Sequence, residues 1–198
     1  MFSLAIAATA FGLIFLGELP DKTAVASLVL GSRYRAAPVL LGVCAAFTLH
    51  VLVASTAGGL IGSLPHRPIE GVTAVLFLIG AVLLFRSNPE EAAAEGEAEA
   101  DKIASGGDKR IALASFGVVA IAEFGDLTQL LTAGLAARYH QPLSVGVGAL
   151  LALWSVSAIA VLAGRTLLKV VPLHRVQQLA AVVLAVLAVI SAISAITG

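Results

Sequence analysis

The segment ELPDKTAVASLVLGSRYR at residues 18–35 recurs 105 positions later as EFGDLTQLLTAGLAARYH at residues 123–140. The two copies share a glutamate, an aspartate, a threonine, an arginine and a tyrosine at equivalent places. A second pair of similar segments follows, because LPHR at 64–67 resembles VPLHR at 171–175. Self-similarity at a nearly fixed offset indicates an internal repeat. The chain is therefore expected to fold as two related halves.

Both copies lie in sequence that is apolar enough for a lipid bilayer. The 198-residue chain is 59% hydrophobic and 12% charged, and its mean hydropathy of +1.01 exceeds that of ordinary soluble domains. A helix needs roughly 20 apolar residues to cross a hydrocarbon core of about 30 Å. Such stretches occur near 2–31, 38–63, 69–86, 111–137, 142–164 and 175–197. We predict an all-α integral membrane protein with six transmembrane helices, since long continuous runs do not fit a transmembrane β-barrel.

The distribution of basic residues predicts the orientation of these spans. Nine lysines and arginines lie on the side of the loops 32–37, 87–110 and 165–174, and two lie on the side of both termini. The first group is Arg33, Arg35, Arg86, Lys102, Lys109, Arg110, Arg165, Lys169 and Arg175, and the second is Arg67 and Arg138. The positive-inside rule then places the central linker on the cytoplasmic side of the membrane and both termini on the outer side. The membrane is expected to be a bacterial inner (plasma) membrane.

The linker divides the chain into three regions. Residues 87–110 hold seven of the twelve acids, with glycine and alanine between them, and should be solvated. They separate a first three-helix repeat at 1–86 from a second at 111–198. Because each half has an odd number of spans, the second half must be inverted relative to the first. Two inverted repeats are the architecture of secondary transporters, whose substrate sites lie near the midplane.

Four acids fall near the centre of predicted spans: Glu18, Asp21, Glu123 and Asp126. An acid there costs at least about 2.5 kcal/mol on insertion scales, so four of them imply a partner or a function. Each pair has i, i+3 spacing and therefore lies on one helical face. Glu70 differs from these four, because it begins the third span, where the helix dipole alone favours an acid.

Together the two pairs would form a ring of four carboxylates. Oxygen ligands suit divalent ions such as Ca²⁺, Mg²⁺ and Mn²⁺, and Thr23, Thr128 and Gln129 offer further oxygens nearby. Pro20 would also free the carbonyl group of Leu16. Carboxylates gathered at low dielectric cannot all stay ionised unless a metal ion or protons occupy the site. That exclusion is the physical basis of cation/proton exchange.

Two further side chains are candidates for proton coupling or counter-charge. Lys22 would partly neutralise the empty site. His50, near the middle of the second span, would relay protons, or it is a neutral histidine hydrogen-bonded to a neighbouring helix.

Other functional classes have no support in the sequence. The net charge is zero, so the sequence shows no excess of positive charge that would bind nucleic acid. The single Cys44 cannot form an intramolecular disulfide. No nucleophile–base set or cofactor motif is present, so we expect neither an enzyme nor a bound cofactor. The expected partners are a divalent metal ion, protons and the lipid bilayer, and a homodimer is left open.

At these motifs the sequence resembles the calcium:cation antiporter-two family of the lysine-exporter superfamily, which includes bacterial manganese exporters and Golgi calcium/manganese–proton exchangers. The family signature ExGDK(S/T) occurs once per half, and here it reads ELPDKT at 18–23 and EFGDLT at 123–128. The resemblance implies that the four carboxylates bind the transported cation, with Thr23, Thr128 and Gln129 beside them. Pro20 replaces the motif glycine, and Leu127 replaces the second basic residue.

The sequence therefore predicts a secondary active exporter of Mn²⁺, with Ca²⁺ as a second candidate substrate, that works by proton exchange. Two alternatives remain at this stage. An acidic ring would also select cations in a passive divalent channel. An exporter of basic amino acids is suggested by the superfamily, although only Lys22 is available to recognise an α-carboxylate.

Overall fold

Helices make up the regular structure of this computed structural model, which describes residues 2–18, 22–63, 65–86, 88, 91, 94–95, 97–98, 107–163 and 173–197. The helices are α1 (Leu4–Glu18), α2 (Lys22–Arg33), α3 (Ala36–Ile61), α4 (His66–Arg86), α6 (Asp108–Ala122), α7 (Leu127–Tyr139), α8 (Pro142–Ala163) and α10 (Leu173–Thr197). No strand occurs among those residues. The predicted all-α class is confirmed for them.

Two of the predicted spans are each divided into two helices. In the segment 2–31, α1 ends at Glu18 and α2 begins at Lys22. In the segment 111–137, α6 ends at Ala122 and α7 begins at Leu127, with a bend of 69° between them. Hydropathy predicts where a segment is apolar but carries no information on backbone dihedrals, so it could not reveal the bend.

The number of membrane spans is supported only in part. Three helical stretches are long and apolar enough to cross a bilayer, namely Ala36–Ile61, Pro142–Leu162 and Gln178–Thr197. The bent pair α6–α7 would be a fourth if it counts as one span, and α1 is a shorter apolar helix. Three or four spans are therefore supported within the described ranges, and the number six stays a prediction.

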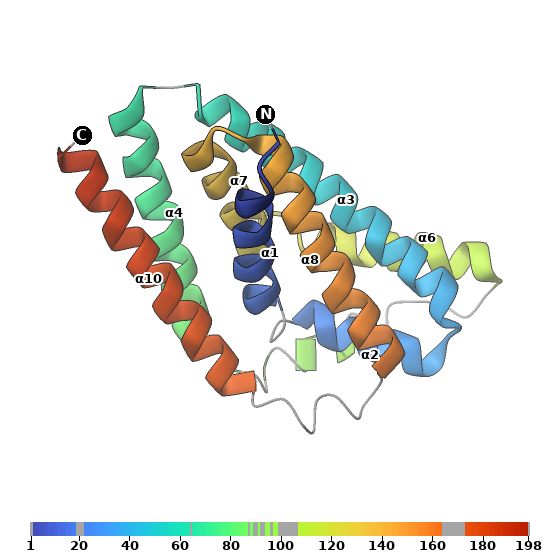
Figure 1. Ribbon diagram of the computed structural model, residues 1–198. Coiled ribbons are helices and arrows are strands. Elements are labelled where there is room, and N and C mark those ends of the chain that lie inside the picture. The colour runs from blue at the N-terminus through green and yellow to red at the C-terminus, as the bar shows by residue number, and fades with distance from the viewer. Residues whose placement is uncertain are drawn as a thin grey trace.

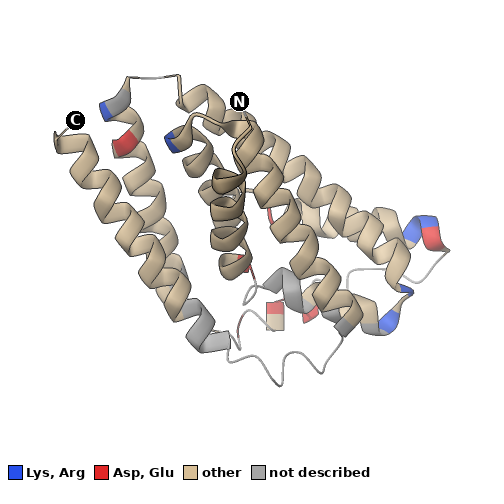
Figure 2. Ribbon diagram, in the orientation of Figure 1, with Lys and Arg blue, Asp and Glu red and all other residues tan. Residues whose placement is uncertain are grey.

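The outer surface of the helices suits contact with lipid. Charged residues lie mainly near helix ends, and long stretches of helix between them carry none (Figure 2). Large apolar side chains are exposed along these stretches, including Leu41, Leu52, Leu83, Leu113, Leu162, Val189 and Ile196. An isolated exposed leucine is ordinary, but exposed leucine, valine and isoleucine over the whole length of several helices indicates an apolar solvent.

The helices of the two halves pack against each other crosswise. Helices α1 and α2 of the first half pack on α8 of the second, and α6 and α7 of the second half pack on α3 of the first. Helices α3 and α8 also contact each other, and α4 pairs with α10 (Figure 1). Most of the hydrophobic core therefore lies between the halves and not within either one.

Glycines permit the closest of these crosswise contacts. A Cβ atom added at Gly148 on α8 would lie 2.1 Å from the carbonyl oxygen of Ala7 on α1, and one added at Gly42 on α3 would lie 2.2 Å from that of Ala112 on α6. Ala7 and Ala112 are 105 residues apart, which is the offset of the sequence repeat. Gly42 and Gly148 are 106 residues apart, so nearly equivalent positions of the two halves make similar contacts.

We expect Gly148→Ala to destabilise the protein, because the added methyl group would force two backbones apart at a cost of about 2 kcal/mol. Gly12→Ala on α1 is the matched control, since a Cβ atom there would have no neighbour within 4 Å. That substitution should stabilise its helix by up to about 1 kcal/mol. Thermal unfolding in detergent, followed by circular dichroism, measures both. Equal effects of the two substitutions would contradict the tight contact.

Candidate cation site at two helix breaks

Glu18 is the last residue of α1, and it is buried. It is 1% exposed, and both of its carboxylate oxygens are shielded from solvent. The sequence accounts for the end of the helix, because the proline at position 20 disfavours helical continuation through the residue before it. A largely apolar helix thus carries a buried carboxylate at its last residue.

Glu123 occupies the corresponding place at the end of α6. It is 2% exposed, its carboxylate oxygens are shielded from solvent, and its backbone leaves the helical region at φ −98° and ψ 7°. The next turn is formed with Gly125, whose φ of +79° is a left-handed conformation that favours glycine. The bend of 69° between α6 and α7 is built on this glycine.

Gln129 holds this turn in place. Its side-chain oxygen accepts a hydrogen bond of 2.6 Å from the backbone N–H of Gly125, and its amide nitrogen is buried without a hydrogen-bond partner. The sequence predicts that the same oxygen would bind the cation. In this structure the oxygen fixes the break in the helix, so the turn and a metal ion would share or exchange it.

Asp126 begins α7 at the N-cap position, with φ −68° and ψ 170°. An aspartate there commonly accepts a hydrogen bond from the first turn, but its side chain makes no such capping bond. Thr128 follows in the first turn of α7 and is 6% exposed. Asp126 is partly buried, and the helix dipole favours negative charge at this end of α7. Because its carboxylate does not cap α7, it can bind a group outside the helix.

The end of α1 lies close to the first turns of α7. A Cβ atom added at Gly17 would lie 3.7 Å from the side chain of Leu131. Leu131 is five residues after Asp126, which is about 7.5 Å along a helix. The end of α1 that carries Glu18 therefore packs beside the first turns of α7, and the turn from Glu123 to Asp126 precedes them.

Part of the predicted site lies outside the described residues. This holds for Asp21, and also for the side chains of Lys22 and Thr23 on α2. Across the residues that are described, no group of three or more histidine, cysteine, aspartate or glutamate side chains could hold a metal ion. The joining of all four carboxylates thus stays a prediction.

His50 lies beside the second break. It is buried on α3, and its Nε2 atom is 3.1 Å from the carbonyl oxygen of Ala120, one turn before Glu123 on α6. Its ring also meets Phe47 and Phe124 edge-on, with centroids 6.4 Å apart in each pair. A neutral ring protonated at Nε2 would donate to that carbonyl oxygen. Hydrogen bonding to a neighbouring helix is therefore confirmed, and a role in proton relay stays a prediction.

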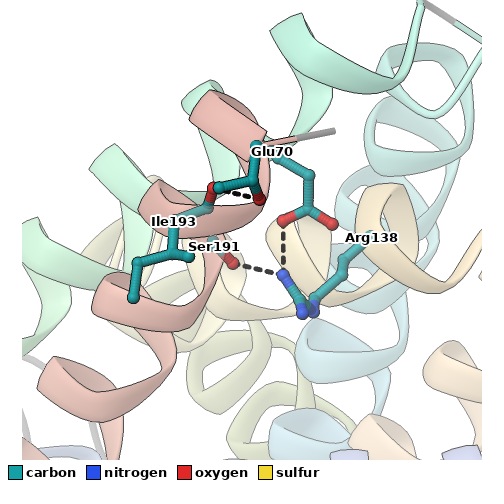
Figure 3. A network of polar contacts seen from close by, with 5 residues as sticks. Glu70, Arg138, Ser191 and Ile193 are labelled. Carbon is teal, nitrogen blue, oxygen red and sulfur yellow. Dashed lines mark hydrogen bonds and ion pairs between the residues drawn. The ribbon is translucent and has the colours of Figure 1, made fainter.

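Sequence reasoning missed the interaction of Glu70. This residue is one turn inside α4 and not at its first position, so the helix dipole is not what accommodates it. Arg138 of α7 donates hydrogen bonds to Glu70 of α4 and to Ser191 of α10 (Figure 3). The only available signal was the presence of Arg138 in the repeat, since nothing local in the sequence links residues 68 positions apart.

The fold and the two breaks together define a class of protein. Apolar helices that are interrupted beside buried carboxylates are the means by which membrane transporters present ion ligands between their spans. Comparison with known proteins identifies the family within this class. A family model described as the divalent cation/proton antiporter GDT1 matches residues 6–92 and 111–198. The chain belongs to this family.

Two relatives are similar over most of the chain. GDT1-like protein sll0615 of Synechocystis sp. (strain ATCC 27184 / PCC 6803 / Kazusa) is 33% identical over 165 residues, which are 77% of this chain and 80% of that protein. Protein PAM71, chloroplastic, of Arabidopsis thaliana is 32% identical over 182 residues, which are 81% of this chain and 49% of that protein. This chain thus spans about half the length of the Arabidopsis protein. No solved structure matches it.

Family membership decides several of the sequence predictions. The resemblance to a family of cation antiporters is confirmed. The protein is a membrane transporter with divalent cations and protons as its substrates, and not an enzyme. The interval 93–110 between the two matched stretches falls within the predicted linker.

Proposed function

We propose that this protein exports Mn²⁺ from a bacterial cytoplasm in exchange for protons, and that the same site accepts Ca²⁺. The observation that carries the proposal is the pair Glu18 and Glu123. They are equivalent in the repeat, both are almost fully buried, and both stand where an apolar helix is interrupted. A carboxylate buried this deeply needs compensation when it is ionised, and a bound cation would supply it.

In the proposed site, Asp21 and Asp126 complete a ring of four carboxylates with these two glutamates. Hydroxyl groups of Thr23 and Thr128 and the amide oxygen of Gln129 would supply further oxygen ligands. An all-oxygen set of this kind suits Mn²⁺ and Ca²⁺ better than zinc or copper, which usually recruit histidine or cysteine. Lys22 would act as counter-charge in the empty site, and His50 would relay protons.

The proposed architecture is six spans in two inverted repeats, 1–86 and 111–198, joined by the linker 87–110. Crosswise packing supports it, because α1 and α2 pack against α8 in the same way that α6 and α7 pack against α3. The family match gives further support, since it too is interrupted within the linker. Both marked chain ends lie toward the same end of the bundle (Figure 1). The excess of basic residues at the loops on the other side favours a cytoplasmic linker and external termini in the plasma membrane.

Transport would follow from competition between metal and protons for one buried site. When the site faces the cytoplasm, Mn²⁺ displaces protons from the carboxylates. When the halves turn against each other, the site faces outward and protons displace the metal. In neither step would several carboxylates be ionised at low dielectric without a bound metal ion or proton.

Reconstitution in liposomes that contain a pH dye and a Mn²⁺ dye tests this function. When Mn²⁺ is added outside, Mn²⁺ should enter and the lumen should become alkaline, because protons leave in exchange. Added Ca²⁺ should slow the entry of Mn²⁺, and lysine should not. Mn²⁺ entry without proton movement would identify a passive channel instead, and lysine uptake would identify an amino-acid exporter.

A further inference from the structure

Three helices meet at a polar network within the apolar bundle. Arg138 on α7 donates hydrogen bonds to the carboxylate of Glu70 on α4 and to the hydroxyl group of Ser191 on α10 (Figure 3). The side chains of Arg138 and Glu70 are only 18% and 7% exposed, and Ser191 is fully buried. A buried ion pair with an added hydrogen bond contributes little stability beyond that of apolar packing, but breaking it by removing one partner is costly. Such a pair is suited to holding one conformation rather than to general stability.

The network joins the two halves at one end of the molecule. Glu70 belongs to the first half, and Arg138 and Ser191 belong to the second. The ends of α4, α7 and α10 that carry these residues lie toward the end of the bundle where both chain termini are found (Figure 1). Helix α7 also packs against α4, with Gly134 next to Leu76 and Phe77.

The equivalent positions in the repeat do not reproduce this ion pair. By the repeat offset, the counterpart of Arg138 is Arg33 on α2, and by the second repeated segment the counterpart of Glu70 is Gln178 on α10. Glu70 is buried, whereas Gln178 is exposed. As far as the described residues go, α2 and α10 do not pack together to the extent that α7 and α4 do. The ion pair between Glu70 and Arg138 is therefore not repeated by the equivalent residues, because Gln178 carries no charge.

We propose that Glu70, Arg138 and Ser191 form a gate that closes the cation pathway at the end of the bundle where the termini lie, and that their ion pair must break before a cation is released there. This inference rests on the proposed function. Because α7 runs from Leu127, directly after Asp126, to Tyr139, directly after Arg138, one short helix connects the candidate cation site to the gate. Occupation of the site and closure of the gate are thereby coupled through the position of α7.

Access of water to Thr73 tests the gate without any transport measurement. Thr73 lies one turn beyond Glu70 on α4 and is fully buried. We would introduce Thr73→Cys in a Cys44→Ser background, which removes the single native cysteine, and measure reaction with a charged thiol reagent in detergent. Labelling should be slow with the gate intact and at least about tenfold faster with Arg138→Gln or Glu70→Gln, because each leaves a buried charge without its partner.

Milder and matched variants guard against a simple loss of folding. Ser191→Ala keeps the ion pair and removes one hydrogen bond, so labelling should rise about fivefold. The charge-reversed pair Glu70→Arg with Arg138→Glu should restore slow labelling. Arg67→Gln removes an exposed positive charge one turn before Glu70, outside the network, and should change nothing. Gel filtration reports whether each variant is folded.

The results separate the gate from the proposed function. Slow labelling in folded Arg138→Gln and Ser191→Ala would overturn the gate, as would an equal rise in Arg67→Gln. If the gate variants label faster but the unaltered protein never exchanges Mn²⁺ for protons in liposomes, the gate stands and the proposed function fails. If the unaltered protein does exchange them, Arg138→Gln should slow coupled exchange by about tenfold, since the closed conformation becomes rare.

Discussion

Glu123→Gln is expected to reduce Mn²⁺-driven proton movement at least about a hundredfold, because groups that merely support a metal ligand already cost 10- to 100-fold when removed. Glutamine has nearly the size of glutamate but carries no negative charge and releases no proton. The buried position of Glu123 leaves no solvent to replace that charge. The measurement is the rate of lumenal alkalinisation in liposomes after Mn²⁺ is added outside.

Three comparisons make this result specific. Glu18→Gln, at the equivalent break, and Asp126→Asn should lose exchange to a similar degree. Glu97→Gln removes an exposed acid of the linker and should retain the full rate. All four variants should remain folded in the membrane fraction. If the Glu18 or Glu123 variant exchanged at the full rate, that carboxylate could not be part of the proposed site.

The second large effect concerns pH. If Mn²⁺ and protons compete for the same carboxylates, metal affinity must fall as pH falls. The loss is about tenfold per pH unit for each proton displaced, and so about a hundredfold per unit when two are displaced. Titration of the detergent-solubilised protein with Mn²⁺, followed by electron paramagnetic resonance of the free ion, gives the slope over the pH range in which the protein stays folded.

Charge removal should change that slope in a defined way. Glu18→Gln takes away one competing proton, so the remaining weak binding should depend less steeply on pH. An affinity that is independent of pH, with Mn²⁺ still bound, would show that metal and protons occupy separate groups. In that case exchange could not arise from competition at one site.

The repeat in the sequence was the most informative single feature. It predicted that Glu18 and Glu123 would occupy equivalent environments, and both are almost fully buried. It also accounts for the similar contacts of Gly42 and Gly148 with positions 105 residues apart. A repeat is informative because it predicts that two positions share one environment, whereas hydropathy predicts only whether each segment faces lipid or water.

Other features were beyond the reach of the sequence because they depend on tertiary contacts or on dihedral angles. The direction of the bend at Gly125 is set by one positive φ value that glycine permits but does not require. The sequence predicted that the side-chain oxygen of Gln129 would bind the cation, but in the structure this oxygen accepts a hydrogen bond from the N–H of Gly125. Glu70 looked adequately explained by its helix, since its partner Arg138 is distant in the chain.

The glycine contacts also bear on how the molecule can move. At Gly148 and at Gly42 one helix backbone lies directly against another, with no side chain between them that could repack. Each contact therefore limits how far the paired helices can slide past each other. Gly31 and Gly58 make backbone contacts of the same kind with Val161 and Ala133, so a turn of one half against the other is limited by four such contacts and not by two.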